Sequence, residues 1–281
     1  MLRKRQQFGF TLLELLVVIS IIGLLASTFI FGYAGWTDKA RLANTRSFSQ
    51  SVRSKVGFNV VGSWTFDDST AVDVSGNNNN GTLVGTYSFV DAVMRTGIQF
   101  NGGRVYLNSL TQTPQAMTFA GWFKKTDATW SSIAFLGKRY GSTGWMLYRN
   151  SGDTAGYFRW YSFYENTSGA TLSYRAWPGI SGLQVDVWYF FTLTRDALGN
   201  MRIYVDGKQT YSGTAPADFR NWSDNAYGIS IGSERAGSGS WNCTGAIFDD
   251  VAIYSETFNV TQVQQLYVEG LSKHNLALNQ K

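Results

Sequence analysis

Histidine, cysteine and proline are scarce in this 281-residue chain, and each shortage excludes a class of structure or chemistry. The one cysteine, Cys243, cannot form an intrachain disulfide, so the fold must depend on its hydrophobic core. The one histidine, His274, lies close to the C-terminus, and it is too little for a Ser-His-Asp triad or a histidine metal cluster. Three prolines against thirty glycines, with 16% aromatic residues, are typical of an all-β domain with many tight turns.

Charge is absent from one long stretch near the N-terminus. The 22 positions from Leu15 to Trp36 carry no charged residue, and a helix needs roughly 20 apolar residues to cross a bilayer core. Glu14 immediately precedes this run, and a carboxylate at membrane depth usually has a partner. The stretch therefore predicts a transmembrane helix at about 13–34 whose glutamate must be paired.

The same residues resemble the N-terminus of type IV prepilins and of the pseudopilins of type II secretion. The shared features are a basic leader that ends in Gly9, then Phe10, Thr11 and Glu14, and the long apolar run. The resemblance implies that a prepilin peptidase removes residues 1–9 and that the new amino group of Phe10 is methylated. It also implies that Glu14 faces the charged N-terminus of a neighbouring pilin subunit. An ordinary signal anchor with a chance glutamate is the alternative.

The leader also decides the charge balance and the orientation in the membrane. Arg3, Lys4 and Arg5 account for much of the net charge of +5, and without them 21 basic and 19 acidic residues remain. This balance is too small to predict a nucleic-acid partner. The positive-inside rule places the N-terminus in the cytoplasm and the C-terminal bulk outside the cytoplasmic membrane. By the resemblance, this single-pass precursor would then enter an extracellular filament.

A helical pattern continues beyond the apolar run. Small or apolar residues recur near one helix face, while basic residues occupy much of the rest. These residues are Trp36, Ala40, Ala43, Phe48, Val52 and Val56. We therefore expect one long pilin-type helix over residues 10–56, with its first half in lipid or in a filament core.

From Gly57 onward the period changes to two, which predicts strands. The clearest strands are expected over residues 60–67, 117–124, 187–194, 202–211 and 246–254. About a dozen such runs, separated by Gly, Asn, Asp and Ser, predict an all-β antiparallel two-sheet jelly-roll sandwich after the helix. A short helix is expected over residues 260–267, and residues 271–281 are expected to form a loose polar tail.

The part from residue 57 to residue 270 resembles the laminin G-like, concanavalin A-like jelly rolls. The resemblance rests on the order and spacing of residues 63–67, 73–77, 80–83, 119–123, 204–207 and 248–254. It implies a two-sheet jelly roll, often with one bound calcium ion, that binds carbohydrate or protein. Such domains are sometimes appended to glycosidases.

Carboxylates suited to catalysis are few. After the leader the chain has five glutamates, namely Glu14, Glu165, Glu234, Glu256 and Glu269. Glycoside hydrolysis usually needs a pair of carboxylates across a cleft, and hydrolases on this fold place two glutamates around an aspartate. The corresponding Glu-x-Asp-x-x-Glu string is absent from the sequence. We therefore expect a protein that is not an enzyme.

A calcium site is the first candidate outside catalysis. Calcium takes oxygen ligands from carboxylates, amides and carbonyls, and such donors occur at Asp73, in residues 77–80 and at Asp249 and Asp250. Since an early loop and the last strand can lie side by side in these jelly rolls, Asp73 and Asp249 are the predicted ligands. The alternatives are that residues 77–80 form a simple turn and that one of the two later aspartates pairs with an arginine.

A carbohydrate site is the second candidate. Sugar C–H faces stack on aromatic rings, while nearby polar groups fix the hydroxyls. Trp64, Trp122 and Trp188 lie in apolar runs, so they are expected in the core. Tryptophans surrounded by glycine, arginine and asparagine are the candidate ligand contacts, with packing as the alternative for each: Trp145, Trp160, Trp177, Trp222 and Trp241.

Together these features predict a type IV pilin-like filament subunit that displays a laminin G-like domain for binding carbohydrate or protein at the cell surface, as in adhesion. Its expected partners are other pilin subunits, the prepilin peptidase and the assembly machinery. One alternative is a pseudopilin of a type II secretion system, whose β domain contacts secreted cargo or caps a short filament. Another is a membrane-tethered glycan-active enzyme, against which the missing carboxylates argue.

Overall fold

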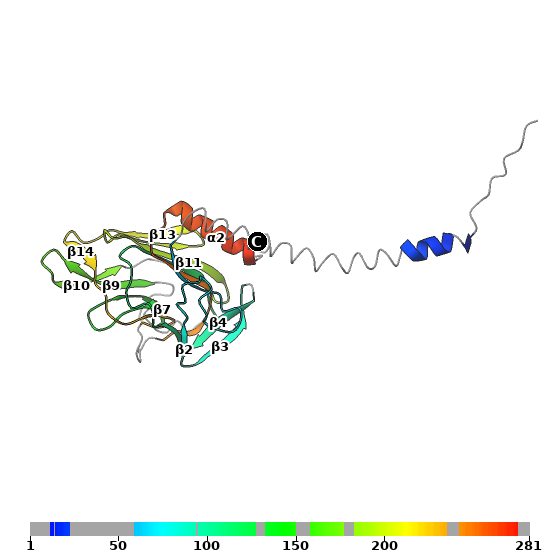
Figure 1. Cartoon of the computed structure of the whole chain (residues 1–281). Coiled ribbons are helices and arrows are strands. Elements are labelled where there is room, and N and C mark those ends of the chain that lie inside the picture. Colours follow the sequence, from blue (N-terminus) through cyan, green and yellow to red (C-terminus); the bar gives the residue numbers. More distant parts are fainter. Residues whose placement is uncertain are drawn as a thin grey trace, which may run out of the picture. The chain divides into compact units, whose positions relative to one another are not determined.

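The computed structural model of the chain describes residues 12–13, 15–22, 59–93, 95–127, 133–149, 158–176, 183–234 and 242–274 (Figure 1). The chain divides into two compact units, Met1–Val56 and Gly57–Lys281. All the described strands belong to the second unit, which we call the head.

In the first unit, residues 12–13 and 15–22 are helical. Their leucine, isoleucine and valine side chains are exposed. Within the described part of the chain, no helix combines the length and the hydropathy that a bilayer crossing needs. Much of the predicted helix over 10–56, including most of the predicted span over 13–34, lies outside the described residues.

The head is a sandwich of two eight-stranded antiparallel sheets, which confirms the predicted two-sheet jelly roll. The first sheet has the order β13 (Lys208–Gly213), β12 (Met201–Val205), β11 (Trp188–Arg195), β6 (Met117–Lys125), β16 (Thr244–Tyr254), β4 (Thr96–Asn101) and β3 (Tyr87–Asp91), with β1 (Val60–Trp64) paired to β16. The second has the order β10 (Thr171–Ala176), β9 (Arg159–Asn166), β8 (Trp145–Arg149), β7 (Ile133–Gly137), β15 (Ile229–Ile231), β5 (Arg104–Leu107) and β2 (Thr82–Val84), with β14 (Phe219–Trp222) paired to β9.

Strand β6 shows how the alternating sequence builds two layers. Phe119 and Phe123 point into the core between the sheets, whereas Ala120 and Trp122 point to the opposite face. Successive side chains of a strand face opposite ways, and both faces of β6 are covered, so almost every residue of this strand is buried. A continuous apolar run of this kind is what a strand covered on both faces requires.

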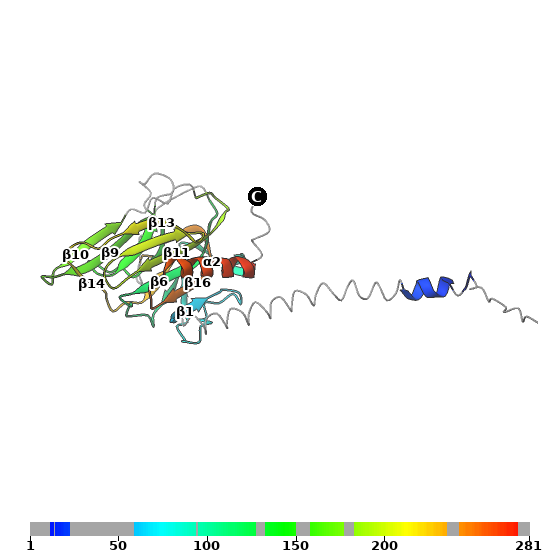
Figure 2. The ribbon, with the colours of Figure 1, turned by 90° about the horizontal axis from the view of Figure 1, so that it is seen from above.

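The outer face of the first sheet is covered by the helix α2 (Val260–His274). Leu266, Tyr267 and Leu271 pack against a cluster that contains Trp122 and Phe190, and Figure 2 shows α2 over this sheet. Asn259 and Gln262 exchange backbone-to-side-chain hydrogen bonds of 2.9 and 3.0 Å at the start of the helix, as in a capping box. The helix extends beyond the predicted 260–267 and through residues 271–274, which were expected to be loose.

The longest strand, β16, changes partner halfway along one edge. Its first half pairs with β4, its second half pairs with β1, and its other edge follows β6 throughout. A register shift lies between Asp249 and Ala252, where Asp250 has a φ of 46°. This bulge bends the strand, and the Asp249 side chain that precedes it is 1% exposed.

Candidate functional site

Three of the tryptophans predicted to contact a ligand lie in the core of the head. Trp145 and Trp160 are fully buried and Trp222 is 3% exposed. The rings of Trp145 and Trp160 stack at 5.3 Å, and the ring of Trp222 meets Trp160 edge-on at 6.4 Å. Buried rings offer no face to a ligand, so the prediction is corrected for these three. Trp177 and Trp241 lie outside the described residues.

These tryptophans hold a buried arginine instead. The Arg195 guanidinium lies 5.7 Å from the Trp145 ring centroid and 5.3 Å from that of Trp222, and its Nη2 donates to the Pro114 carbonyl at 2.7 Å. Burial lowers the pKa of Arg195 to about 9, against the opposing effect of Asp224. The group therefore stays charged at neutral pH and stabilises the core through cation–π contacts.

Asp73, one of the two predicted calcium ligands, organises its own loop. Its Oδ1 accepts the backbone N–H groups of Ser63 and Ser75, both at 2.9 Å, and its Oδ2 accepts that of Asn79 at 2.9 Å. Burial raises the pKa of Asp73, but the hydrogen bonds from Ser75, Ser63 and Asn79 outweigh it and the net shift is downward. Asp73 is therefore an ionised carboxylate that anchors its own loop.

Asp249, the other predicted ligand, lies at the β16 bulge in an acidic neighbourhood. Burial and the charges of Asp250 and Asp67 raise its pKa to about 9, although it accepts N–H groups from Asp250 and Val93. Among the residues described, no group of three or more His, Cys, Asp or Glu side chains is suited to hold a metal. Calcium binding stays a prediction.

A pair of exposed tyrosines forms the most accessible aromatic surface of the described head. Tyr140 is 51% exposed and Tyr227 is 41% exposed, and their ring centroids are 4.3 Å apart with the planes tilted by 31°. A hydrogen bond with Tyr140 raises the pKa of Tyr227, and the charge of Tyr106 adds to the shift. We call Tyr140 and Tyr227 the tyrosine pair.

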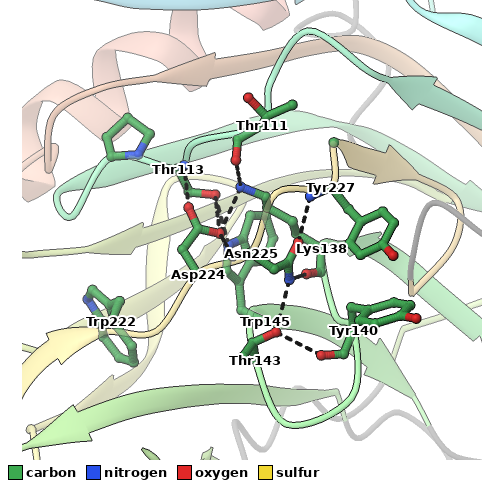
Figure 3. A network of polar contacts seen from close by, with 12 residues as sticks. Thr111, Thr113, Lys138, Tyr140, Thr143, Trp145, Trp222, Asp224, Asn225 and Tyr227 are labelled. Carbon is green, nitrogen blue, oxygen red and sulfur yellow. Dashed lines mark hydrogen bonds and ion pairs between the residues drawn. The ribbon is translucent and has the colours of Figure 1, made fainter. Parts of the chain in front are cut away.

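The tyrosine pair comes from two loops at the ends of interior strands of the second sheet (Figure 3). Tyr140 lies between β7 and β8, in a turn where Tyr140 and Thr143 exchange backbone hydrogen bonds of 3.2 and 3.1 Å. Tyr227 lies between β14 and β15, and its N–H donates to the Asn225 Oδ1 at 3.0 Å. Gly144 closes the first loop with a φ of +80°, and a Cβ there would meet the Lys138 carbonyl oxygen at 2.1 Å, so this position requires glycine.

A buried lysine ties these loops together. Lys138 is fully buried, and its Nζ lies 2.7 Å from the Asp224 Oδ1 and donates to the Thr111 carbonyl at 2.7 Å. Burial lowers the pKa of Lys138, whereas its hydrogen bond and ion pair with Asp224 oppose the shift. Figure 3 shows this ammonium where the loops before β6, after β7 and before β15 meet.

Asparagine and threonine side chains complete the network. The Asn225 Nδ2 donates to the Lys138 carbonyl at 2.7 Å, and the Asn225 N–H donates to the Asp224 Oδ1 at 2.9 Å. The Thr113 N–H donates to the Asp224 Oδ2 at 2.6 Å, and the Trp145 indole N–H donates to the Thr113 Oγ1 at 3.4 Å. The loops that carry the exposed tyrosine pair are thus connected to the core, and tyrosine rings on such loops can stack on a ligand at a low ordering cost.

Sequence reasoning did not find this site. Its residues carry only weak local signals: a tyrosine in Lys138–Gly144 and another in Ser223–Gly228, both in loops rich in small residues. The two tyrosines are far apart in the sequence, so the strand register that brings their loops together had to be known first. The processing residues Gly9, Phe10 and Glu14 lie outside the described residues, so their roles stay predictions.

Both parts of the chain match a known family model. Residues 99–264 match the concanavalin A-like lectin/glucanases superfamily. Residues 4–30 match the prokaryotic N-terminal methylation motif, the segment that holds Gly9, Phe10 and Glu14. These matches agree with the two resemblances drawn from the sequence.

Solved structures with a similar fold include three binding domains or complexes. Domain 4 of AbnA, a GH43 extracellular arabinanase from Geobacillus stearothermophilus in complex with arabinotriose, matches with a TM-score of 0.59 at 18% identity, over 75% of this chain and 98% of that one. The receptor binding domain of botulinum neurotoxin mosaic serotype C/D matches with 0.56 at 17% identity, over 75% and 50%. The binding domain of Paraclostridial Mosquitocidal Protein 1 matches with 0.56 at 18% identity, over 74% and 52%. At these identities the likeness shows the fold alone.

Proposed function

Because the chain belongs to the concanavalin A-like lectin/glucanases superfamily and begins with a prokaryotic N-terminal methylation motif, we propose that it is a pilin-like surface subunit whose head binds carbohydrate. The observation that carries the proposal is the union of these two parts in one chain. The first part provides processing and assembly, and the second provides a binding surface.

The proposal gives each processing residue a role. In this proposal the prepilin peptidase cuts after Gly9, the amino group of Phe10 is methylated, and Glu14 compensates the N-terminal charge of a neighbouring subunit. A buried unpaired charge is costly, so the Glu14 pairing penalises misplaced subunits and fixes their register. The precursor is anchored in the cytoplasmic membrane, and the head lies outside and reaches the surface in a filament.

The composition and the core of the head support a binding role rather than a catalytic one. After the leader the chain has five glutamates and one histidine, and the described core of the sandwich is filled by apolar and aromatic side chains. One structural neighbour was solved in complex with arabinotriose, and two others are named as binding domains. The complex with arabinotriose supports a carbohydrate ligand for this head, and the two binding domains support a binding role.

Calcium is a separate proposal, for the β16 bulge. The carboxylate of Asp249 is almost fully buried beside two further aspartates, and such a group is stabilised either by a proton or by a cation. Calcium would be held there by Asp249, with oxygen ligands as its chemistry requires. Asp73 is left out of this proposal, because its Oδ1 accepts two backbone N–H groups and its Oδ2 a third, whereas each oxygen of Asp249 accepts one.

A pseudopilin of a type II secretion system is the alternative assembly. A pseudopilin would carry the same methylation motif, and its head would contact secreted cargo.

Expression of the chain together with its peptidase and assembly proteins distinguishes a pilus subunit from a pseudopilin. We expect a mature N-terminus at methylated Phe10 and the chain in filaments sheared from the cell surface. Processed chain that stays in the envelope and retains a secreted protein would instead favour the pseudopilin, and an unprocessed chain would contradict both.

A further inference from the structure

We propose that the tyrosine pair is the glycan contact of the head, and that the buried Lys138 ammonium, not a metal ion, holds it in shape. The inference rests on the proposed carbohydrate-binding function and deepens it by naming the site, the class of ligand and the group that organises the site.

Exposure singles out the tyrosine pair. Among the described large hydrophobic side chains that are exposed, only three are aromatic, namely Tyr87, Tyr140 and Tyr227. Tyr87 lies on the edge strand β3 and contacts Phe89, whereas Tyr140 and Tyr227 contact each other. Two tyrosines supply a rigid, amphipathic contact with little entropy to lose, because each has only two side-chain torsions.

The backbone of each tyrosine is held independently of a ligand. The Tyr140 carbonyl accepts the Thr143 Oγ1–H at 2.7 Å, and the Asn225 side chain bridges the two loops by donating to the Lys138 carbonyl and accepting the Tyr227 N–H. The Gly228 N–H donates to the Tyr106 hydroxyl at 3.2 Å on the adjoining strand β5. The backbone that carries the two rings is therefore preorganised, which reduces the cost of binding.

Lys138 performs the task that a structural cation would perform. Its ammonium gathers the carboxylate of Asp224 and the carbonyl of Thr111 at 2.7 Å each, and Asp224 in turn accepts N–H groups from Thr113 and Asn225. A buried ion pair often adds little stability relative to apolar packing, and specifying one arrangement is one of its uses. Here the ion pair specifies the position of Asn225, which joins the loop of Tyr227 to the loop of Tyr140.

The ligand class follows from the charges around the pair. The two basic side chains that immediately precede Tyr140 are both engaged: Lys138 with Asp224, and Arg139 with the buried Glu234 at 3.3 Å. The Lys138 ammonium is therefore closed to a carboxylate or sulfate of an acidic glycan, and Glu234 offsets the charge of the partly exposed Arg139. Ring faces and phenol hydroxyls suit a neutral sugar that has one apolar C–H face and hydroxyls at its rim.

The test uses the isolated head, residues 57–281, which contains every described strand and the whole described core. A panel of immobilised neutral and acidic glycans identifies the tightest neutral ligand, and calorimetry then compares variants on it. We expect Tyr140→Ala and Tyr227→Ala each to weaken binding by about tenfold or more, as central aromatic contacts do. Tyr87→Ala, the matched exposed tyrosine, should leave the affinity unchanged.

Two further measurements address Lys138. A chelator should leave the affinity of the folded head unchanged, and Lys138→Met should weaken binding while far-ultraviolet circular dichroism still reports a folded sandwich. Asp224→Asn provides the second route to the same disruption if Lys138→Met does not fold.

The outcomes separate this inference from the proposed function. A wild-type head that binds no glycan overturns both. A head that binds a glycan equally well in the wild type and in both tyrosine variants overturns the assigned site and leaves the proposed function standing. Loss of binding in chelator with the fold intact overturns the role of Lys138. Tyrosine-dependent binding to a protein, with no glycan bound, overturns carbohydrate as the occupant.

Discussion

Asp249→Asn is predicted to change how the stability of the head depends on pH. Burial and the charges of Asp250 and Asp67 raise the folded-state pKa of Asp249 to about 9, while an unfolded aspartate titrates near ~3.9. Between these values the folded head keeps a proton that the unfolded chain has released. Stability from this group is therefore greatest below about pH 4 and is lost as pH rises toward 9.

The size of the effect follows from the number of protons involved. A difference of one bound proton changes the free energy of unfolding by up to about 1.4 kcal/mol per pH unit. From pH 5 to pH 8 the loss is up to about 4 kcal/mol, or roughly 10 °C in the melting temperature of a domain of this size. Asparagine keeps the shape and an acceptor for the Asp250 N–H but does not titrate.

Thermal unfolding of the head at pH 5, 6, 7 and 8 in chelator measures this slope. We expect the wild type to lose stability as pH rises, Asp249→Asn to be nearly flat, and Asp91→Asn, an exposed aspartate on β3, to follow the wild type. Parallel profiles for the wild type and Asp249→Asn would refute the reasoning. Added calcium should raise the melting temperature most at pH 8, and only when Asp249 is present, if the bulge binds the ion.

Three further predictions concern the anchor, a loop and the core. Glu14→Ala should abolish or misregister filaments, seen by electron microscopy of sheared fractions, without changing the melting temperature of the head; normal filaments would contradict the charge pairing. Gly144→Ala should destabilise the head by about 1–3 kcal/mol in urea unfolding, because the alanine Cβ at this positive φ would clash with the Lys138 carbonyl oxygen. An unchanged urea midpoint of unfolding would contradict the described loop geometry. Trp160→Ala should cost about 3–5 kcal/mol by the same assay, and a loss of glycan affinity at unchanged stability would show that Trp160 is a contact residue after all.

Local sequence patterns were sufficient for much of the sandwich. The period of two located β6 and β11, and the Asp206-Gly207 pair sits at the β12–β13 turn with positive φ at both residues, 51° and 72°, as a two-residue hairpin requires. The expected core positions of Trp64 and Trp122 are confirmed, with both nearly fully buried. Trp188 is only partly buried and packs against the cluster that contains Trp122. These features depend on neighbours along the chain, which a sequence displays directly.

Features set by distant contacts were not visible in the sequence. Trp145 and Trp160 lie near glycines and arginines, which suggested exposure. Trp145 instead lies on β8, which is buried along its whole length, and Trp160 is fully buried on β9. Lys138 looks like an ordinary loop lysine, and its burial depends on Asp224, which follows a different strand. The tyrosine pair depends in the same way on the register of β7, β15 and β5.

Binding of the purified head to a broad panel of immobilised glycans tests the central claim most directly. The account predicts saturable binding to particular neutral glycans that is competed by the same free sugar. An intact, folded head that binds no glycan on the panel would contradict it and would leave the superfamily fold serving a structural or protein-binding role.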